Sequence, residues 1–311
     1  MSQHIAIDIG GTQIRAALFT DESIVPRQIE KIDTSGEQST LERLCALISR
    51  IWPGNDEISA IGIATAGAVD PYRGIVISAP NIKGWIDVPL RDHIRNCFHV
   101  PVFIGNDANL AAIGEWKYGA GQGHHDLIYL TISTGIGGGI ILGDRLLLGH
   151  QGLAGEMGHI TVLPDGPVCG CGQKGHIEAL SSGTAIAQWT KSELDKGASS
   201  ILEKEANISS RVIARAANQG DQLAIEAFER AGHFLGMALA NFLHLFNPTT
   251  VIFGGGVTQS GDLLLIPAQK ALQTFILHPQ YLADFSLSRA SLGDEAGLIG
   301  ALVLARSGRI Q

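Results

Sequence analysis

Short apolar runs and one stretch of helical spacing set out the first part of the chain. Residues 5–9 form an apolar run, and residues 14–19 resume the same pattern after two glycines and a threonine. Two apolar runs joined in this way predict a β-hairpin with glycines at its tip. Residues 39–52 then place apolar side chains at helical spacing, and residues 58–64 return to a strand-like run. The predicted order is strands, helix, strand.

A second set of elements follows the first in the same outline. Residues 102–105 read as a short buried strand that leads into Asn106 and Asp107, either of which can cap a helix. A new strand is predicted at 127–132, and another at 139–142 after a second glycine-rich tip. The two hairpins resemble each other in pattern, although no close sequence repeat is present.

The rest of the chain reads mainly as helix. Helical spacing is found at about 180–192, 209–246 and 263–276, and residues 251–253 form a strand-like run before three consecutive glycines. Together these patterns predict an α/β protein with two lobes and a ligand cleft between them. Each lobe would contribute one glycine-tipped hairpin.

Composition and charge favour a globular protein of two domains and disfavour proteins that bind nucleic acid or membranes or that are exported. The chain has 311 residues, of which 45% are hydrophobic and 17% are charged, so it can bury the cores of two domains. Its formal net charge is −8, with no block of like charges, which disfavours nucleic acid and anionic membranes as partners. The first residues show no basic segment before an apolar stretch, and the longest apolar run, 127–142, is broken by polar residues and glycines. We expect a cytoplasmic protein.

The four cysteines fit a reducing compartment. Cys169 and Cys171 are separated by one residue, a spacing that suits a shared metal ion better than two disulfides. Cys45 and Cys97 lie in apolar, helical-looking segments, and we expect them to be inert core thiols.

Both glycine-rich hairpins are candidates for binding phosphate. Glycines at 10–11 and 135 let backbone N–H groups approach phosphate oxygens, and the hydroxyls of Thr12 and Thr134 add donors. Either hairpin alone is more often an ordinary tight turn. Asp8, at the end of the first strand, is placed to order water around Mg²⁺. Pairing with a neighbouring arginine, or capping the turn, explains that carboxylate equally well.

Asp107 is the candidate catalytic base. Phosphoryl transfer to an alcohol needs a base near the acceptor hydroxyl and little other covalent chemistry. Asp107 lies at a predicted junction between strand and helix, and Asn106 beside it can bind a neighbouring hydroxyl as both donor and acceptor. A lone aspartate in this position is more often a helix cap, so the role depends on the residues around it.

A metal site is predicted between residues 159 and 176. Two imidazoles and two thiolates form a closed tetrahedral set, as in structural zinc sites: His159, Cys169, Cys171 and His176. The alternative is a mobile glycine loop with spare thiols. Zinc here would fix the loop that presents Glu156 and Glu178, whose carboxylates can accept hydrogen bonds from vicinal hydroxyls. His159 can serve twice, with one ring nitrogen on the metal and the other near a hydroxyl.

Taken together and in this order, these motifs resemble the ROK family of sugar kinases and sugar-responsive repressors. The resemblance covers essentially the whole chain. The residues that carry it are Asp8-x-Gly10-Gly11-Thr12, Asn106-Asp107, Ser133-Thr134-Gly135-x-Gly137-Gly138-Gly139, Glu156-x-Gly158-His159, Cys169-x-Cys171, Glu178, Gly254-Gly255-Gly256 and the segment from Glu295 to Ala301.

The resemblance implies a fold, cofactors and a set of site residues. It implies the actin-like ATPase fold, with a smaller lobe of residues 1–118 and 297–311 and a larger lobe of residues 119–296 that carries the zinc loop. It assigns Asp107 as the base for the sugar 6-hydroxyl and implies ATP with Mg²⁺, structural Zn²⁺ and a homodimer. The implied sugar-binding residues are Ala66, Gly67, Asn81, Asn106, Asp107, Glu156, His159 and Glu178. The implied ATP-binding residues are Asp8, Gly10, Gly11, Thr12, Gln13, Thr134, Gly135, Gly255 and Gly256.

One position departs from the family pattern. The family has a third cysteine where this chain has His176, so we expect a zinc site with two cysteines and two histidines. The phosphate motif begins almost at the N-terminus, where repressors of the family carry a DNA-binding domain. With the negative charge, this argues against a DNA-binding regulator. A catalytically idle sugar sensor remains as a third reading.

The identity of the substrate is the most specific prediction that the resemblance allows. The segment from Ala79 to Trp85, together with the motif around Glu156 and His159, is similar to bacterial glucokinases. We therefore expect phosphorylation of glucose by ATP. Kinases of N-acetylmannosamine, N-acetylglucosamine and fructose share most of these residues, and they stay open as alternatives.

Overall fold

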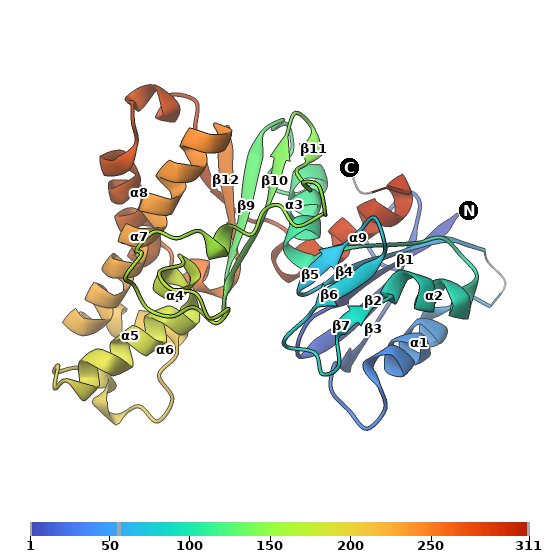
Figure 1. Cartoon of the computed structure of the whole chain (residues 1–311), viewed down its shortest axis with the longest axis horizontal. Coiled ribbons are helices and arrows are strands. Elements are labelled where there is room, and N and C mark those ends of the chain that lie inside the picture. Colours follow the sequence, from blue (N-terminus) through green and yellow to red (C-terminus); the bar gives the residue numbers. More distant parts are fainter. Residues whose placement is uncertain (1, 55–56, 310–311) are drawn as a thin grey trace. The chain divides into compact units, whose positions relative to one another are not determined.

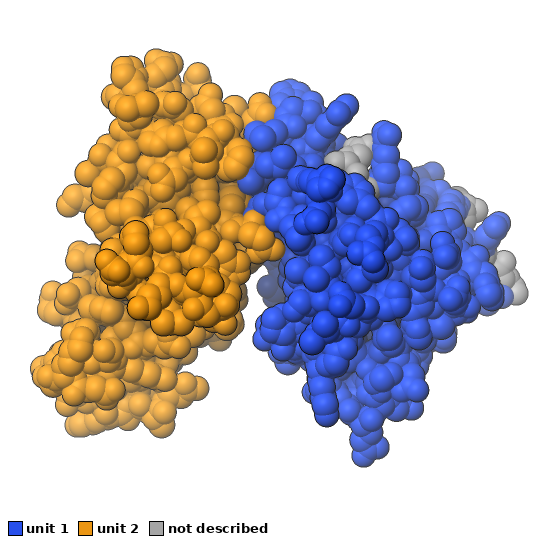
Figure 2. Space-filling model, in the orientation of Figure 1, with its two compact units in different colours: residues 1–125, 139–155, 290–311 blue, residues 126–138, 156–289 orange. Residues whose placement is uncertain are grey.

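The chain forms two compact units, coloured blue and orange in Figure 2. The computed structural model describes residues 2–54 and 57–309. Each unit is built from segments that are not continuous in sequence. Unit 1 consists of residues 1–125, 139–155 and 290–311, and unit 2 consists of residues 126–138 and 156–289.

These boundaries differ from the division expected from the sequence. Residues 119–125, 139–155 and 290–296 were assigned to the larger lobe, and in the structure they belong to unit 1. The strand that follows the second glycine-rich tip is therefore shared between the two units, since the first segment of unit 2 ends at Gly138 and the next residue, Gly139, belongs to unit 1.

The main sheet of unit 1 has five strands in the order β3-β2-β1-β4-β8. In it, β2 pairs antiparallel with both β3 and β1, whereas β4 pairs parallel with both β1 and β8. The strands are β1 (Gln3–Ile9), β2 (Gln13–Thr20), β3 (Gln28–Asp33), β4 (Ile58–Thr65) and β8 (Val102–Asn106). The hairpin expected at the start of the chain and the strands expected at 58–64 and 102–105 are confirmed.

Helices cover this sheet (Figure 1), and its strands β1, β2, β4 and β8 are buried along most of their length, whereas the edge strand β3 is largely exposed. Ile5, Ile7 and Ile9 share one apolar core with the buried residues of α1 (Thr40–Ile51) and α2 (Leu90–Phe98). Side chains alternate across a strand, so the residues between them face the opposite side. A small sheet of β5 (Ala68–Asp70), β6 (Ile75–Ser78) and β7 (Ile86–Val88) lies in the chain between β4 and α2.

Glycines allow the last helix, α9 (Ala296–Ser307), to pack closely against unit 1. A side chain at Gly62 on β4 would overlap the carbonyl of Ala301. A side chain at Gly300 would in turn overlap the carbonyl of Leu110 on α3 (Asp107–Tyr118). The segment from 297 was expected to return to the first lobe, and α9 does belong to unit 1.

The second sheet has the order β11-β10-β9-β12-β13. In it, β12 pairs parallel with both β9 and β13. The strands are β9 (Leu127–Ile132), β10 (Ile136–Leu142), β11 (Arg145–Leu146), β12 (Thr250–Gly254) and β13 (Ser286–Arg289). Strands at 127–132, 139–142 and 251–253 were expected and are confirmed; β10 begins earlier than expected.

The helices of unit 2 are more broken than the sequence suggested. The longest, α7 (Gln222–Phe246), packs along α8 (Asp262–Phe275). The other α-helices are α4 (Glu178–Ser181), α5 (Gly183–Asp195) and α6 (Ser210–Asn218). Short 3₁₀ helices complete the fold: η1 (Met157–His159), η2 (Ile201–Lys204), η3 (Gly256–Ser260), η4 (Pro279–Leu282) and, in unit 1, η5 (Gly293–Glu295).

The prediction of one helix over 209–246 was wrong. Gly220 has a φ of +87°, which a helix cannot accommodate, and the Asp221 carboxylate then accepts a hydrogen bond from the Ala224 amide (2.9 Å) to cap a new helix. A single helix over 180–192 was also wrong, because Ser182 ends one short helix and caps the next. Among the described residues, no helix is long and apolar enough to cross a membrane.

Candidate active site and metal centre

The tip of the first hairpin lies in unit 1, between β1 and β2. The Thr34 hydroxyl donates a hydrogen bond to the Gly10 carbonyl (2.6 Å), and the Thr34 amide donates to the Thr12 carbonyl (2.8 Å). Neither Gly10 nor Gly11 has a positive φ. A side chain at Gly11 would instead come within 2.8 Å of the Asn81 Cβ. Glycine is therefore required here by close approach of a neighbouring segment, not by turn geometry.

Asp8 pairs with an arginine on the adjacent strand. Asp8 lies opposite Arg15 in the register of β1 and β2, and Arg15 donates to the Asp8 carboxylate at 2.6 Å. Arg15 also donates to Glu295 (3.0 Å) and to the carbonyl of Asp294. Burial alone would lower the pKa of Arg15, but the surrounding acidic groups raise it overall. The pairing considered as an alternative for Asp8 is thus present, and it leaves that carboxylate one-fifth exposed for a further ligand.

Asn106 and Asp107 sit where β8 ends and α3 begins. The Asn106 side chain caps α3 by accepting from the Asn109 amide (3.1 Å), and its amide nitrogen donates to the Gly67 carbonyl (3.0 Å). Asp107 is the first residue of α3, and one of its carboxylate oxygens accepts from the Ala108 amide (2.8 Å). Asn106 therefore takes the capping role, and Asp107 is not the helix cap that a lone aspartate in this position would more often be.

The other expected sugar-binding positions of unit 1 lie close to Asn106 and the hairpin tip. The Ala66 amide donates to the Ile9 carbonyl (3.0 Å), which ties this turn to the end of β1. Gly67 has a φ of +98°, and a side chain there would overlap the Ser78 carbonyl. Unit 1 thus brings Ala66, Gly67, Asn81, Asn106 and the hairpin tip together. The close approach of Asn81 to Gly11 and the hydrogen bond from Asn106 to the Gly67 carbonyl show this directly.

The second hairpin tip lies in unit 2 and contacts Glu178. The Ile136 amide donates to Glu178 Oε2 (2.9 Å), and Cys169 Sγ donates to Glu178 Oε1 (3.3 Å). A side chain at Gly135 would overlap the same carboxylate. Glu178 was predicted only as a sugar ligand, and the structure shows that it also joins the glycine hairpin to the cysteine loop.

A cavity of about 480 Å³ in unit 2 contains two of the expected ATP-binding residues. Thr134 and Gly256 line it, beside the cationic side chains of Lys191 and Arg211. Gly255 precedes η3 with a φ of +85°, and a side chain there would overlap the Ile132 backbone. The sequence reading missed Lys191 and Arg211, because each lies alone on its own helix with no motif around it. Positive charge beside this cavity suits a phosphorylated ligand.

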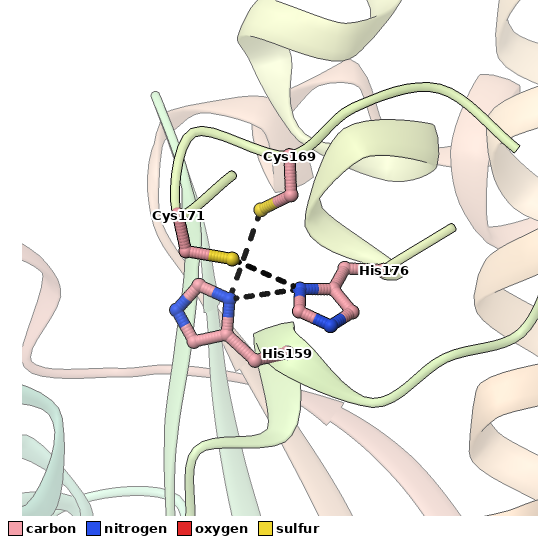
Figure 3. A group of neighbouring side chains, drawn as sticks. All are labelled: His159, Cys169, Cys171 and His176. Atoms are coloured by element: carbon pink, nitrogen blue, oxygen red, sulfur yellow. Dashed lines mark hydrogen bonds between the residues drawn. The ribbon is translucent and has the colours of Figure 1, made fainter. Parts of the chain in front are cut away.

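The four predicted metal ligands meet in unit 2, where their side chains point toward one another (Figure 3). Each offers one ligand atom, and all four atoms lie within 4.8 Å of one another. A tight turn closed by the Cys169 amide and the Gln173 carbonyl (2.7 Å) presents the two cysteines. The histidines come from η1 and from the short segment before α4.

The ligand spacing fits a tetrahedral ion. Zinc bonds of about 2.0–2.1 Å to nitrogen and about 2.3 Å to sulfur place two nitrogens about 3.3 Å apart, and a nitrogen and a sulfur about 3.6 Å apart. The Nδ1 atoms of His159 and His176 are 3.3 Å apart. Cys169 Sγ is 3.7 Å from the His159 Nδ1, and Cys171 Sγ is 3.3 Å from the His176 Nδ1. The donor set and its dimensions therefore suit zinc, with no open position for water.

His159 has a second nitrogen that faces away from this cluster. Its Nε2 lies 4.0 Å from the exposed Glu156 carboxylate, while its Nδ1 belongs to the ligand set. Glu156 itself precedes η1, and its carbonyl accepts from the His159 amide (3.0 Å). The geometry thus leaves Glu156 and one face of His159 available to a polar ligand.

The prediction that Cys45 and Cys97 are both core thiols was wrong. Cys97 is exposed and Cys45 is half-buried. Their sulfur atoms are 3.3 Å apart. All four cysteines are free thiols in the structure.

Comparison with known proteins identifies the family. The sequence profile of the ROK family matches residues 4–307. The glucokinase of Streptomyces coelicolor is 36% identical over 313 residues, which cover 98% of each chain. The glucokinase of Thermotoga maritima is 34% identical over 304 residues, which cover 96% of this chain and 95% of the relative.

A solved structure supports the same assignment. The ROK family glucokinase from Streptomyces griseus, determined in complex with glucose and AMPPNP, is 38% identical and superposes with a TM-score of 0.82. The match covers 98% of this chain and 99% of that one. The expected fold is confirmed: the chain belongs to the ROK family and has its actin-like ATPase fold.

Proposed function

We propose that this protein is an ATP-dependent hexose kinase that phosphorylates glucose at its 6-hydroxyl. The observation that carries the proposal is the full-length similarity to glucokinases, one of them solved with glucose and an ATP analogue. Kinases of N-acetylmannosamine, N-acetylglucosamine or fructose are the nearest alternatives.

Asp107 is the proposed base. It accepts the proton of the 6-hydroxyl as that oxygen attacks the γ-phosphorus in line. Its place at the first position of α3 supports this role, since the backbone there is fixed by the Asn106 cap and by the Ala108 amide bond to one carboxylate oxygen. The proposed sugar contacts of unit 1 are Asn106, Asn81 and the backbone at Ala66 and Gly67.

Glu156, His159 and Glu178 of unit 2 are proposed to bind further sugar hydroxyls. Glu178 already accepts from Ile136 and Cys169, yet a carboxylate can accept about four hydrogen bonds. When Cys169 is a thiolate it has no proton to donate, and Glu178 Oε1 is then available to a hydroxyl. Binding of a metal by the cysteines would thus prepare Glu178 for sugar.

The nucleotide is proposed to occupy the cavity lined by Thr134 and Gly256, with Lys191 and Arg211 as added cationic contacts. The other expected contacts are Gly135 and Gly255 in unit 2, and Asp8 with residues 10–13 in unit 1. Mg²⁺ would supply charge neutralisation on the phosphates. Arg15 holds the Asp8 carboxylate in one orientation for that purpose.

Zinc is proposed as a structural ion held by His159, Cys169, Cys171 and His176. Burial raises the pKa of the Cys169 thiol to about 11, so a thiolate there needs a compensating positive charge. A bound cation supplies that charge and fixes the loop between η1 and α4. The family resemblance further suggests a cytoplasmic homodimer acting in sugar breakdown. Light scattering from the purified protein tests the dimer.

The function is tested by ADP release with Mg·ATP across glucose, mannose, fructose, N-acetylglucosamine and N-acetylmannosamine. We expect the highest kcat/KM with glucose. A higher value for another sugar would replace glucose as the substrate. Sugar binding by calorimetry without turnover of any sugar would favour the idle sensor.

Asp107→Asn tests the base. It should lower kcat by about 1,000-fold, the usual contribution of general base catalysis, while the sugar affinity stays nearly unchanged. The matched control is Asp262→Asn, because Asp262 is likewise the first residue of a helix, α8. Near-normal turnover of Asp107→Asn would remove this residue from the role of base.

A further inference from the structure

A second group of thiol and imidazole side chains lies in unit 1, outside every residue assigned above. Cys45 of α1 and His93 and Cys97 of α2 each offer one ligand atom, and these atoms lie within 4.8 Å of one another. His93 and Cys97 are four residues apart on one helix, so they project from the same face. Cys45 approaches them from the neighbouring helix.

Neighbouring side chains fix the positions of α1 and α2 around this group, and the charged side chains nearby pair with one another. Trp52, at the end of α1, stacks on Phe98, at the end of α2, with ring centroids 5.0 Å apart. That contact fixes the spacing of the two helices near the cysteines. The charged neighbours on α2 are paired elsewhere, since Asp92 forms ion pairs with both Arg91 (3.5 Å) and Arg95 (3.2 Å).

The spacing favours a metal over a disulfide. The sulfur atoms of Cys45 and Cys97 are 3.3 Å apart. Two thiolates on a tetrahedral zinc ion lie about 3.8 Å apart, so the pair needs to open by only about half an ångström. A disulfide needs the sulfurs at about 2.05 Å, a closure of more than about 1 Å. A disulfide would also leave His93 without a role in the group.

We propose that Cys45, His93 and Cys97 form a second metal site, which binds a thiophilic divalent cation such as Zn²⁺ with three protein ligands. Because Cys97 is exposed, the fourth position faces solvent and takes water or a small ligand. Two thiolates and an imidazole select a borderline or soft cation over Mg²⁺ or Ca²⁺. The bound ion would clamp α1 to α2 and stabilise unit 1.

The test uses the full-length protein, stripped of metal, fully reduced and kept free of oxygen. Co²⁺ is the probe, because thiolate ligation gives charge-transfer bands and tetrahedral sites give intense visible bands. We expect two equivalents of bound Co²⁺, both displaced by Zn²⁺. Cys97→Ser and His93→Ala should each weaken one binding event by more than about 100-fold, beyond the usual loss from an outer-shell change. The other event should remain.

Control variants assign the two events. Cys171→Ser should remove only the event that Cys97→Ser leaves intact. His150→Ala, at an exposed histidine outside both groups, should bind two equivalents like the wild type. His93→Gln keeps a polar side chain and serves if His93→Ala fails to fold.

Two results would overturn the proposal. One is uptake by the reduced wild type of a single equivalent that Cys97→Ser does not weaken, including the case in which mass spectrometry finds Cys45 joined to Cys97 before reduction. The other is an unchanged second event in Cys97→Ser. Either would leave Cys45 and Cys97 without a resident cation.

Discussion

Replacement of Glu115 should destabilise unit 1 and weaken nucleotide binding together. Glu115 lies in the last turn of α3, and its side chain is completely buried. Oε2 accepts from the amides of Ala120 (2.8 Å) and Ser291 (3.1 Å) and from the Ser291 hydroxyl (3.3 Å), while Oε1 accepts from the Leu292 amide (2.8 Å). The carboxylate thus fixes the segment that leads to Glu295, the partner of Arg15.

The magnitude follows from the donors left without a partner. Each buried group that loses its hydrogen bond costs about 1–3 kcal/mol. In Glu115→Gln the remaining oxygen can take the Oε2 position and keep the three hydrogen bonds made there. The NH₂ group then faces the Leu292 amide, which is also a donor, so that hydrogen bond is lost. It should therefore cost about 2 kcal/mol. Glu115→Ala loses all four bonds, but water can enter the space that it opens, so we expect about 4 kcal/mol.

Two measurements test these effects. Urea denaturation gives the free energy of unfolding of unit 1, and the KM for ATP reports nucleotide binding. Where the denaturation curve resolves two transitions, each transition is fitted on its own. Glu22→Gln, at an exposed position of unit 1 in the turn after β2, is the matched control and should change stability by less than about 0.5 kcal/mol. If both Glu115 variants unfold like the wild type, the segment is held by other contacts and the reasoning fails.

Two further changes test unit 2. Gly255→Ala should cost about 2–4 kcal/mol and raise the KM for ATP, because Gly255 has a φ of +85° and its new Cβ would lie 2.7 Å from the Ile132 carbonyl carbon. Gly256→Ala is the control for stability, since nothing lies within 4 Å of its Cβ; equal losses of stability in the two variants would contradict the argument. Removal of zinc by a chelator, or by Cys169→Ala with Cys171→Ala, should lower the unfolding temperature and the sugar affinity together, whereas His176→Cys should keep the ion at this site. Elemental analysis that finds no metal at these residues in the native protein would refute the structural zinc.

Much of the fold could be predicted because local pattern and tertiary packing agree. The first hairpin, the strand over 102–105 and the helix after Asn106 each have an apolar run with a clear turn or cap. The break at Gly220 was missed because the apolar pattern continues on both sides of it, and only the backbone dihedral separates the two helices. The small sheet of β5, β6 and β7 was missed because strands of three or four residues are too short to show a period.

The site shows the same difference between local and distant signals. Cys169 and Cys171 are adjacent enough in sequence to suggest a metal, and the structure brings both histidines to them. Cys45 and Cys97 are separated by 52 residues, so no spacing rule connects them. The second bond of Glu178, to the Ile136 amide, depends on how the loop folds back, which residue type alone does not specify.

The divided composition of unit 1 has a consequence for how the protein is made. Its five-stranded sheet is complete once β8 has left the ribosome, but α9, which covers that sheet, is synthesised only after the whole of unit 2. The face containing Gly62 must stay uncovered during that interval, because its partner does not yet exist. Unit 2 can fold during this interval, before α9 is available to complete unit 1. Final closure of unit 1 therefore waits until α9 has left the ribosome, and any nascent chain stalled before residue 296 would expose an apolar sheet to chaperones and proteases.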